Sequence, residues 1–188
     1  MTPRLSLAAC AALTAALAAP WPAAAHDDET KLAPGAQAQI AEVRRATARF
    51  HDIRVALDPA LGGYGPQPVQ DLAGNICIDE PGKGAMGVHY VNGALLTPFL
   101  DPLKPQALMY EPKPGGMPRL VGVEYIVFKS VWEAQFPGTT PRLFGRKFHE
   151  MGADNRYGLP PFYELHLWLW QPNRSGMFND WNPAVRCR

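Results

Sequence analysis

The segment 162–170 alternates regularly along its length, and this alternation predicts a β-strand with two different faces. One face carries Tyr163, Leu165, Leu167 and Leu169, as expected for a strand packed against a core. The opposite face combines an acid and an imidazole with aromatic rings: Phe162, Glu164, His166, Trp168 and Trp170. A rigid aromatic wall interrupted by ionisable groups is typical of a lined pocket.

Two further segments, 85–91 and 119–128, show the same alternation. Each has one purely apolar face and one apolar face with a single ionisable residue, His89 or Glu124. A charge among apolar neighbours is costly to bury unless it is paired or bound to another group. If the ionisable faces coincide, the following residues converge: His89, Glu124, Glu164 and His166, with His149 as a fifth candidate.

Two imidazoles and two carboxylates are credible ligands for zinc, iron, manganese or copper, and they could also form an acid–base pair. The chain has no tight HxH or HExxH spacing, so such ligands would have to come from distant strands. The alternative is a structural network in which the two glutamates pair with arginines such as Arg119, Arg142 or Arg146. Both explanations remain open, and neither indicates a reaction.

The loop 152–161 is polar and leads directly into the aromatic strand. It contains Arg156 and Tyr157, which could cap the pocket, whereas Trp168 and Trp170 could stack on a planar ligand. These four residues are the candidate ligand-binding side chains. The alternatives are a surface turn for the loop and ordinary packing for the tryptophans.

Residues 36–57 carry apolar side chains at helical spacing, with charged residues on the other side. This pattern predicts one amphipathic helix that ends before Pro59. Arg54 interrupts the apolar stripe near its end, and Ile53 could take its place.

The predicted strands are joined by turn-rich links too short for helical crossovers, which favours antiparallel pairing. In 119–128 the alternation places Val121 on the purely apolar face and Leu120 on the face of Glu124. Further elements are expected at 107–111 and 144–151 (strands) and 130–136 (a helical turn). We predict an α+β fold in which the N-terminal helix packs on a curved, mainly antiparallel sheet that could form a partial β-barrel.

Residues 1–25 are typical of a cleavable export signal, with Arg4 before an uncharged apolar run and small residues at 23–25. Neither this run nor any later segment reaches the length of a membrane span. We expect a signal peptide at 1–25, a flexible leader at 26–35 and one domain at 36–188, in a periplasmic or secreted protein. A retained anchor and lipid modification of Cys10 are the alternatives. His26 would begin the mature chain and could chelate copper, or it could have no role.

Cysteine content and charge agree with an exported protein. Cys77 and Cys187 are the only cysteines beyond the signal, and export would place them where disulfides persist. We expect one disulfide between them, with a reactive thiol or a metal-bound thiolate as alternatives. The net charge of +1 gives no general attraction to nucleic acid, and no nucleic-acid partner is expected. The His/Glu residues named above make a metal ion or small molecule the expected partner.

Three sequence blocks look familiar: 71–75 (DLAGN), 77–92 (CIDEPGKGAMGVHYVN), and 175–178 (SGMF) followed by 180–183 (DWNP). They resemble a group of uncharacterised exported bacterial proteins, over about residues 44–187. The resemblance implies a bacterial, exported, single-domain protein. It implies no catalytic role for any residue.

Overall fold

The computed structural model describes residues 32–187. The predictions for the export signal, for Cys10 and for His26 lie outside the described residues. Residues 36–57 are helical, as predicted, but in three successive pieces: α1 (Ala36–Thr47), the 3-10 helix η1 (Ala48–His51) and α2 (Ile53–Leu57). The break occurs at Asp52, whose extended backbone ends η1 and whose side chain accepts a hydrogen bond from the Arg54 backbone amide. Ile53 is buried and Arg54 is exposed, so Ile53 continues the apolar stripe.

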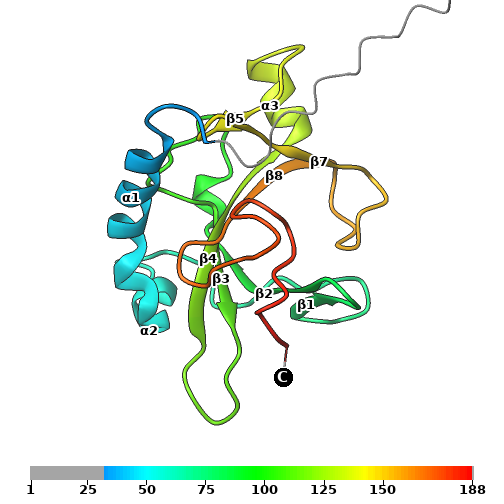
Figure 1. The fold of residues 1–188 in the computed structure, drawn as a ribbon. Helices are drawn as coiled ribbons and strands as arrows, with labels where there is room; N and C mark the ends of the chain where they lie inside the picture. Colours follow the sequence, from blue (N-terminus) through cyan, green and yellow to red (C-terminus); the bar gives the residue numbers. More distant parts are fainter. Residues whose placement is uncertain (1–31, 188) are drawn as a thin grey trace, which may run out of the picture.

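Eight strands follow, together with the 3-10 helix η2 (Gly93–Leu95) and the helix α3 (Lys129–Gln135). The strands are β1 (Cys77–Glu80), β2 (Gly84–Val91), β3 (Ala107–Glu111), β4 (Arg119–Phe128), β5 (Arg142–Leu143), β6 (Arg146–Lys147), β7 (His149–Met151) and β8 (Phe162–Leu167). Six of them form an antiparallel sheet in the order β1-β2-β3-β4-β8-β7, and β5 pairs with β6. The predicted α+β fold is confirmed: α1 packs against a sheet that curls into a half-barrel (Figure 1).

The main core lies between the helices and one face of the sheet. Figure 1 shows α1 and α2 together along one side of the strands. Ile40 and Val43 of α1 are buried in the same cluster as Tyr125 of β4 and Leu165 and Leu167 of β8. The apolar face predicted for β8 therefore packs against the helix, and the ionisable residues lie on the opposite face.

A β-bulge in β4 changes the faces on which Leu120 and Val121 lie, compared with the prediction. Met109 pairs with Gly122 and Tyr110 pairs with Leu120, which leaves Val121 without a partner on β3. Leu120 therefore belongs to the helix-side core, whereas Val121 packs with Trp168 on the other side of the sheet. The strict alternation was wrong at these two positions because a bulge inserts one residue into the strand.

A second correction concerns the end of the aromatic strand. β8 ends at Leu167, and the amides of both Trp170 and Gln171 donate to the Val121 carbonyl. The chain bends there, and Trp170 packs against the helix-side core, where the Arg44 guanidinium lies 4.9 Å from the ring centroid. Trp170 thus does not share the face of Glu164 and His166.

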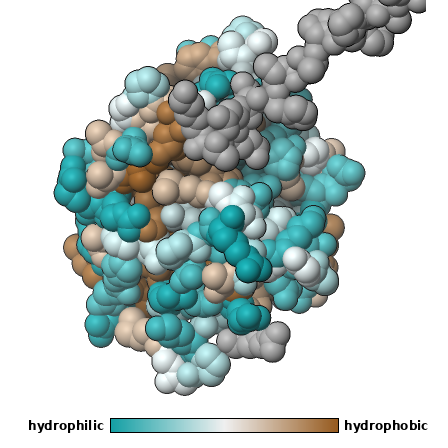
Figure 2. Space-filling model, viewed as in Figure 1, coloured by the Kyte–Doolittle hydropathy of each residue, from teal (hydrophilic) through white to brown (hydrophobic). Residues whose placement is uncertain are grey.

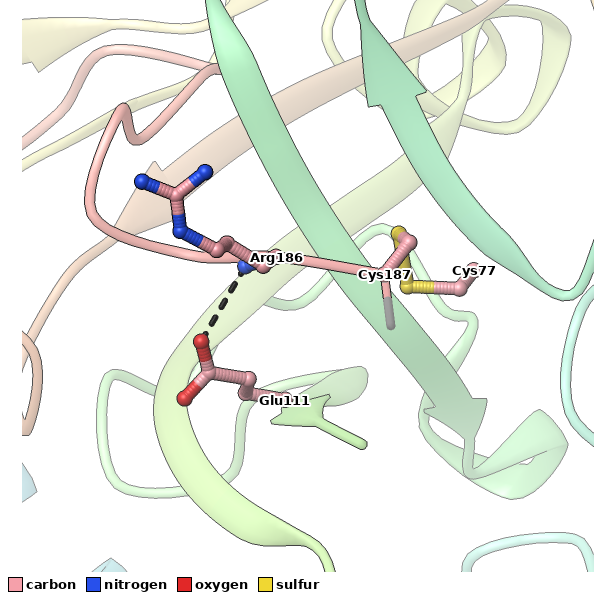
Figure 3. The surroundings of a disulfide bond; sticks show 4 residues. All are labelled: Cys77, Glu111, Arg186 and Cys187. Carbon is pink, nitrogen blue, oxygen red and sulfur yellow. Dashed lines mark hydrogen bonds between the residues drawn. A yellow bond between two sulfur atoms is a disulfide. The ribbon is translucent and has the colours of Figure 1, made fainter. Parts of the chain in front are cut away.

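The C-terminal segment is tied to the first two strands. The Cys77–Cys187 disulfide predicted from the sequence is present, and Figure 3 shows it beside the hydrogen bond from the Arg186 amide to Glu111. Asn182 is fully buried and exchanges two backbone hydrogen bonds with Ala85 of β2. These contacts hold residues 180–187 against the sheet (the red segment in Figure 1).

Hydrophilic residues cover most of the face shown in Figure 2, and hydrophobic ones gather beside α1. Among the described residues 32–187, no helix is both long and apolar enough to cross a membrane.

Candidate functional site

The site is built on the face of the sheet opposite the helices, where β4 and β8 are neighbours. Glu124 of β4 pairs directly with His166 of β8, and residues that oppose each other in an antiparallel pair project from the same face. His89 of β2 lies opposite Met109 of β3 and reaches Glu124 diagonally across β3, where Ala107 is the partner of Glu124. Three strands far apart in sequence thus converge.

The donor atoms of these three residues lie close together. His89 Nε2 is 3.6 Å from Glu124 Oε2, and His166 Nε2 is 3.8 Å from Glu124 Oε1. One donor atom from each residue can be chosen so that all three lie within 4.8 Å of one another. All three side chains are buried, and we call them the inner cluster.

A second group of residues adjoins the inner cluster: His149 of β7, Glu164 of β8 and Asp180 of the C-terminal segment, which we call the outer cluster. His149 pairs directly with Glu164 across the strands, and their Nδ1 and Oε1 atoms are 4.0 Å apart. Asp180 Oδ2 lies 3.3 Å from His149 Nδ1, and Asp180 Oδ1 lies 3.3 Å from His166 Nδ1. Asp180 therefore touches both clusters.

Several buried polar atoms of the two clusters lack hydrogen bonds. His89 Nε2, both ring nitrogens of His166 and Glu164 Oε1 have no hydrogen-bond partner within residues 32–187. His166 Nδ1 is at ion-pair distance from Asp180, but the geometry is not that of a hydrogen bond. Leaving one buried polar atom unsatisfied costs about 1–3 kcal/mol, so four such atoms in one place require an explanation.

Burial and mutual charge shift the pKa values of the inner cluster. Burial, together with the charge of His166, lowers the pKa of His89 to about 3. Burial alone would lower the pKa of His166, but the negative charges of Glu124, Asp180 and Glu164 outweigh it and raise that pKa to about 9. Burial also raises the pKa of Glu124 and of Glu164, and the negative charge of Glu164 adds to the rise for Glu124. Strongly shifted groups in one place are a mark of functional sites, although structural networks also produce them.

Each cluster faces a different cavity. His89 and Glu124 border a small, mostly apolar pocket of about 70 Å³, which Tyr157, Leu159 and Phe162 also line. The outer cluster lies in a larger groove of about 730 Å³, which contains polar and basic residues such as Lys147. The inner cluster thus borders an apolar pocket, whereas the outer cluster borders a groove with a mixed polar and apolar lining.

The four candidate ligand-binding residues do not lie together. Tyr157 lines the apolar pocket, with its hydroxyl 3.8 Å from Met86 Sδ. Arg156 pairs with Asp71, which anchors the loop above the sheet. Trp168 is buried, and its indole nitrogen donates to the Asn179 carbonyl. Its ring stacks on the His166 ring, so it packs against a residue of the inner cluster and does not face a ligand. Trp170 lies on the helix side with His51.

The three arginines considered for a structural network with Glu124 and Glu164 have other contacts in the structure. Arg119 pairs with Glu111, and Arg142 donates to the Gly145 carbonyl. The Arg146 guanidinium lies 5.5 Å from the centroid of the Phe178 ring. The partners of Arg119 and Arg142 are thus other than Glu124 and Glu164.

Sequence reasoning missed Asp180. It belongs to a block that was noted for its resemblance alone, and it follows no strand whose alternation would assign it a face. Its position depends on Asn182 and on the disulfide, both of which act through distant contacts. The one sequence feature that could have drawn attention to Asp180 is its place in the motif Asp180-Trp181-Asn182-Pro183.

Comparisons with protein-family models, with curated proteins and with solved structures found no match for this chain. The resemblance to exported bacterial proteins therefore stays a prediction, and any function must be argued from the geometry of the two clusters.

Proposed function

We propose that this protein is exported and binds a divalent transition metal ion through His89, Glu124 and His166. One observation carries the proposal: the Nε2 atoms of both histidines are buried, face Glu124 and lack a hydrogen-bond partner in the described part of the chain. A cation between them would satisfy both nitrogens and the carboxylate at once. It would also offset the cost of burying that carboxylate.

The spacing and the chemistry of the donors support a metal ion. Metal–ligand bonds of about 2.0–2.2 Å place neighbouring ligand atoms roughly 3–4 Å apart. The distances of 3.6 and 3.8 Å around Glu124 fall in that range. Two imidazoles and one carboxylate are typical of zinc and of non-haem iron, whereas calcium and magnesium prefer oxygen ligands.

Three protein ligands leave coordination positions for a small molecule, as in catalytic zinc sites. His89 and Glu124 border the apolar pocket, so a molecule bound there would present an apolar group to Tyr157, Leu159 and Phe162. The pocket of about 70 Å³ has room for a few non-hydrogen atoms only. A short aliphatic ligand fits this space better than a sugar ring.

A hydrogen-bonded structural network of the same residues is the competing explanation. The ion-pair distances of 3.3 Å that join Asp180 to His149 and to His166 favour it. The unsatisfied nitrogens of His89 and His166 count against it, because a network that stabilises a core pairs its polar atoms.

Elemental analysis of protein purified without a metal-affinity tag tests the proposal. We expect bound zinc or iron in the wild-type protein, and re-addition of Zn²⁺ after chelation should raise the melting temperature. His89→Ala should abolish the part of the Zn²⁺-induced shift that comes from this site, while circular dichroism shows that the variant folds. His51→Ala is the matched control, since His51 is exposed on the helix side.

The structural network would be favoured if the wild-type protein bound no metal and if His89→Ala only unfolded it.

Export is supported by the Cys77–Cys187 disulfide, which is compatible with an oxidising compartment. Cell fractionation with mass measurement of the mature chain tests it. A full-length chain in the cytoplasmic fraction would contradict export.

A further inference from the structure

The outer cluster has the composition of a second metal site. His149, Glu164 and Asp180 each offer one donor atom, and the three atoms lie within 4.8 Å of one another. They come from β7, β8 and the C-terminal segment, so three separate parts of the chain aim their donors at one place. One imidazole with two carboxylates is a ligand set that zinc, iron and manganese accept.

An independent observation indicates that this cluster lacks a partner. Glu164 is 2% exposed, and its Oε1 atom has no hydrogen-bond partner among residues 32–187. His149 Nδ1 lies 4.0 Å from that oxygen, which is too long for a hydrogen bond. The buried carboxylate therefore points into the outer cluster and is not satisfied there by the protein.

We propose that the outer cluster holds a second divalent metal ion next to the one in the inner cluster, so that the site is a two-metal centre. This inference rests on the proposed function, because it adds a second ion to the same site. Asp180 connects the two proposed metal positions. Asp180 lies 3.3 Å from a nitrogen of His149 and 3.3 Å from a nitrogen of His166.

Charge supports two ions rather than one. The clusters combine three carboxylates with three imidazoles. Metal ligation requires neutral imidazoles and ionised carboxylates, so the six ligands would carry three negative charges. One divalent cation leaves a net negative charge on largely buried groups. A second cation removes that deficit and leaves a single positive charge, which would attract an anionic ligand.

The surroundings predict different behaviour for the two ions. The inner cluster is buried, whereas the His149 side chain is 60% exposed and borders the larger groove. The outer ion should therefore exchange faster and be removed first by a chelator. An anionic ligand would reach it through the groove, which Lys147 also lines.

Metal stoichiometry tests the two-metal centre. The protein with its disulfide intact is stripped with a chelator, dialysed against Zn²⁺, and analysed for zinc per chain. We expect two equivalents in the wild type and in the control His51→Ala, and one equivalent in His149→Ala and in His89→Ala. His149 is mostly exposed, so its replacement should leave the fold intact.

The possible failures are distinguishable. One equivalent in the wild type, kept in His149→Ala and lost in His89→Ala, overturns the second site and leaves the proposed function standing. One equivalent that is lost in His149→Ala and kept in His89→Ala overturns the inner site instead. No bound zinc in the wild type overturns both.

Discussion

Glu124 and His166 are direct partners across β4 and β8, with 3.8 Å between Glu124 Oε1 and His166 Nε2. Their position depends on the register of one strand pair. A slip of β8 by one residue would turn His166 toward the helices and expose Leu165 on the other face. The helix-side core, to which Leu165 and Tyr125 belong, therefore holds the inner cluster in place.

Asp180 should orient His166 for metal binding. A carboxylate beside the second nitrogen of a ligating histidine fixes the ring and increases its basicity, and its loss typically lowers metal affinity about 10–100-fold. We expect Asp180→Asn to lower zinc affinity by that factor, measured by competition with a chromogenic chelator. The measurement is best made in a His149→Ala background, in which only the inner cluster binds.

Asp101→Asn is the control for this substitution, because it removes the same charge from an exposed loop where Asp101 pairs with Lys104. If Asp180→Asn bound zinc as tightly as this control, Asp180 would have no orienting role.

Gly84 should be needed to bring Asp180 to the site. Its φ is +102°, and a Cβ atom there would collide with the Asn182 carbonyl oxygen. Gly82 has a similar positive φ of +81° but open space around it. We expect Gly82→Ala to cost about 1–2 kcal/mol through backbone strain alone, and Gly84→Ala to cost about 1–3 kcal/mol more through the collision.

Urea unfolding measures both free energies, and zinc binding should weaken only in Gly84→Ala because Asn182 also sets the place of Asp180. Equal destabilisation by the two substitutions would show that the close approach to Asn182 does not matter.

The Cys77–Cys187 disulfide should contribute strongly to stability. It joins residues 110 positions apart, and restricting so long a loop in the unfolded chain is expected to stabilise the fold by about 2–5 kcal/mol. The double substitution of both cysteines by serine should lower the free energy of unfolding by that amount. A reducing agent should destabilise the wild type similarly and leave the double variant unchanged; sensitivity of the double variant would point to another cause.

Asp71 should make stability depend on pH in an acidic window. Hydrogen bonds from the Asn75 side chain and backbone, together with Arg156, lower the pKa of Asp71 from 3.8 to about 2. Because the pKa is lower in the folded state, the ionised form stabilises the protein above about pH 4. That contribution is lost as the pH falls toward 2.

Asp71→Asn should therefore be less stable than the wild type at pH 6, and the difference should shrink between pH 4 and pH 2. Thermal unfolding of both proteins across this range checks the prediction. A difference that stays constant would mean that the charge of Asp71 contributes nothing.

Much of the fold could be predicted from the sequence, because strand and helix periodicity are local properties. The alternation in 162–170 correctly assigned Leu165 and Leu167 to the core, and it placed Glu164 and His166 on the opposite face. The two cysteines beyond the expected export signal allowed one disulfide, and the structure contains it. These features follow from side-chain geometry within a few residues or from simple counting.

The tertiary structure alone decided where alternation stops and which distant groups meet. The bulge at Val121 and the bend before Trp170 arise from hydrogen bonds between strands, so no single segment encodes them. Asp180 reaches His149 and His166 only because Asn182 and the disulfide hold the C-terminal segment against the sheet. Periodicity determines the face on which a side chain lies, whereas packing between remote segments determines its neighbours.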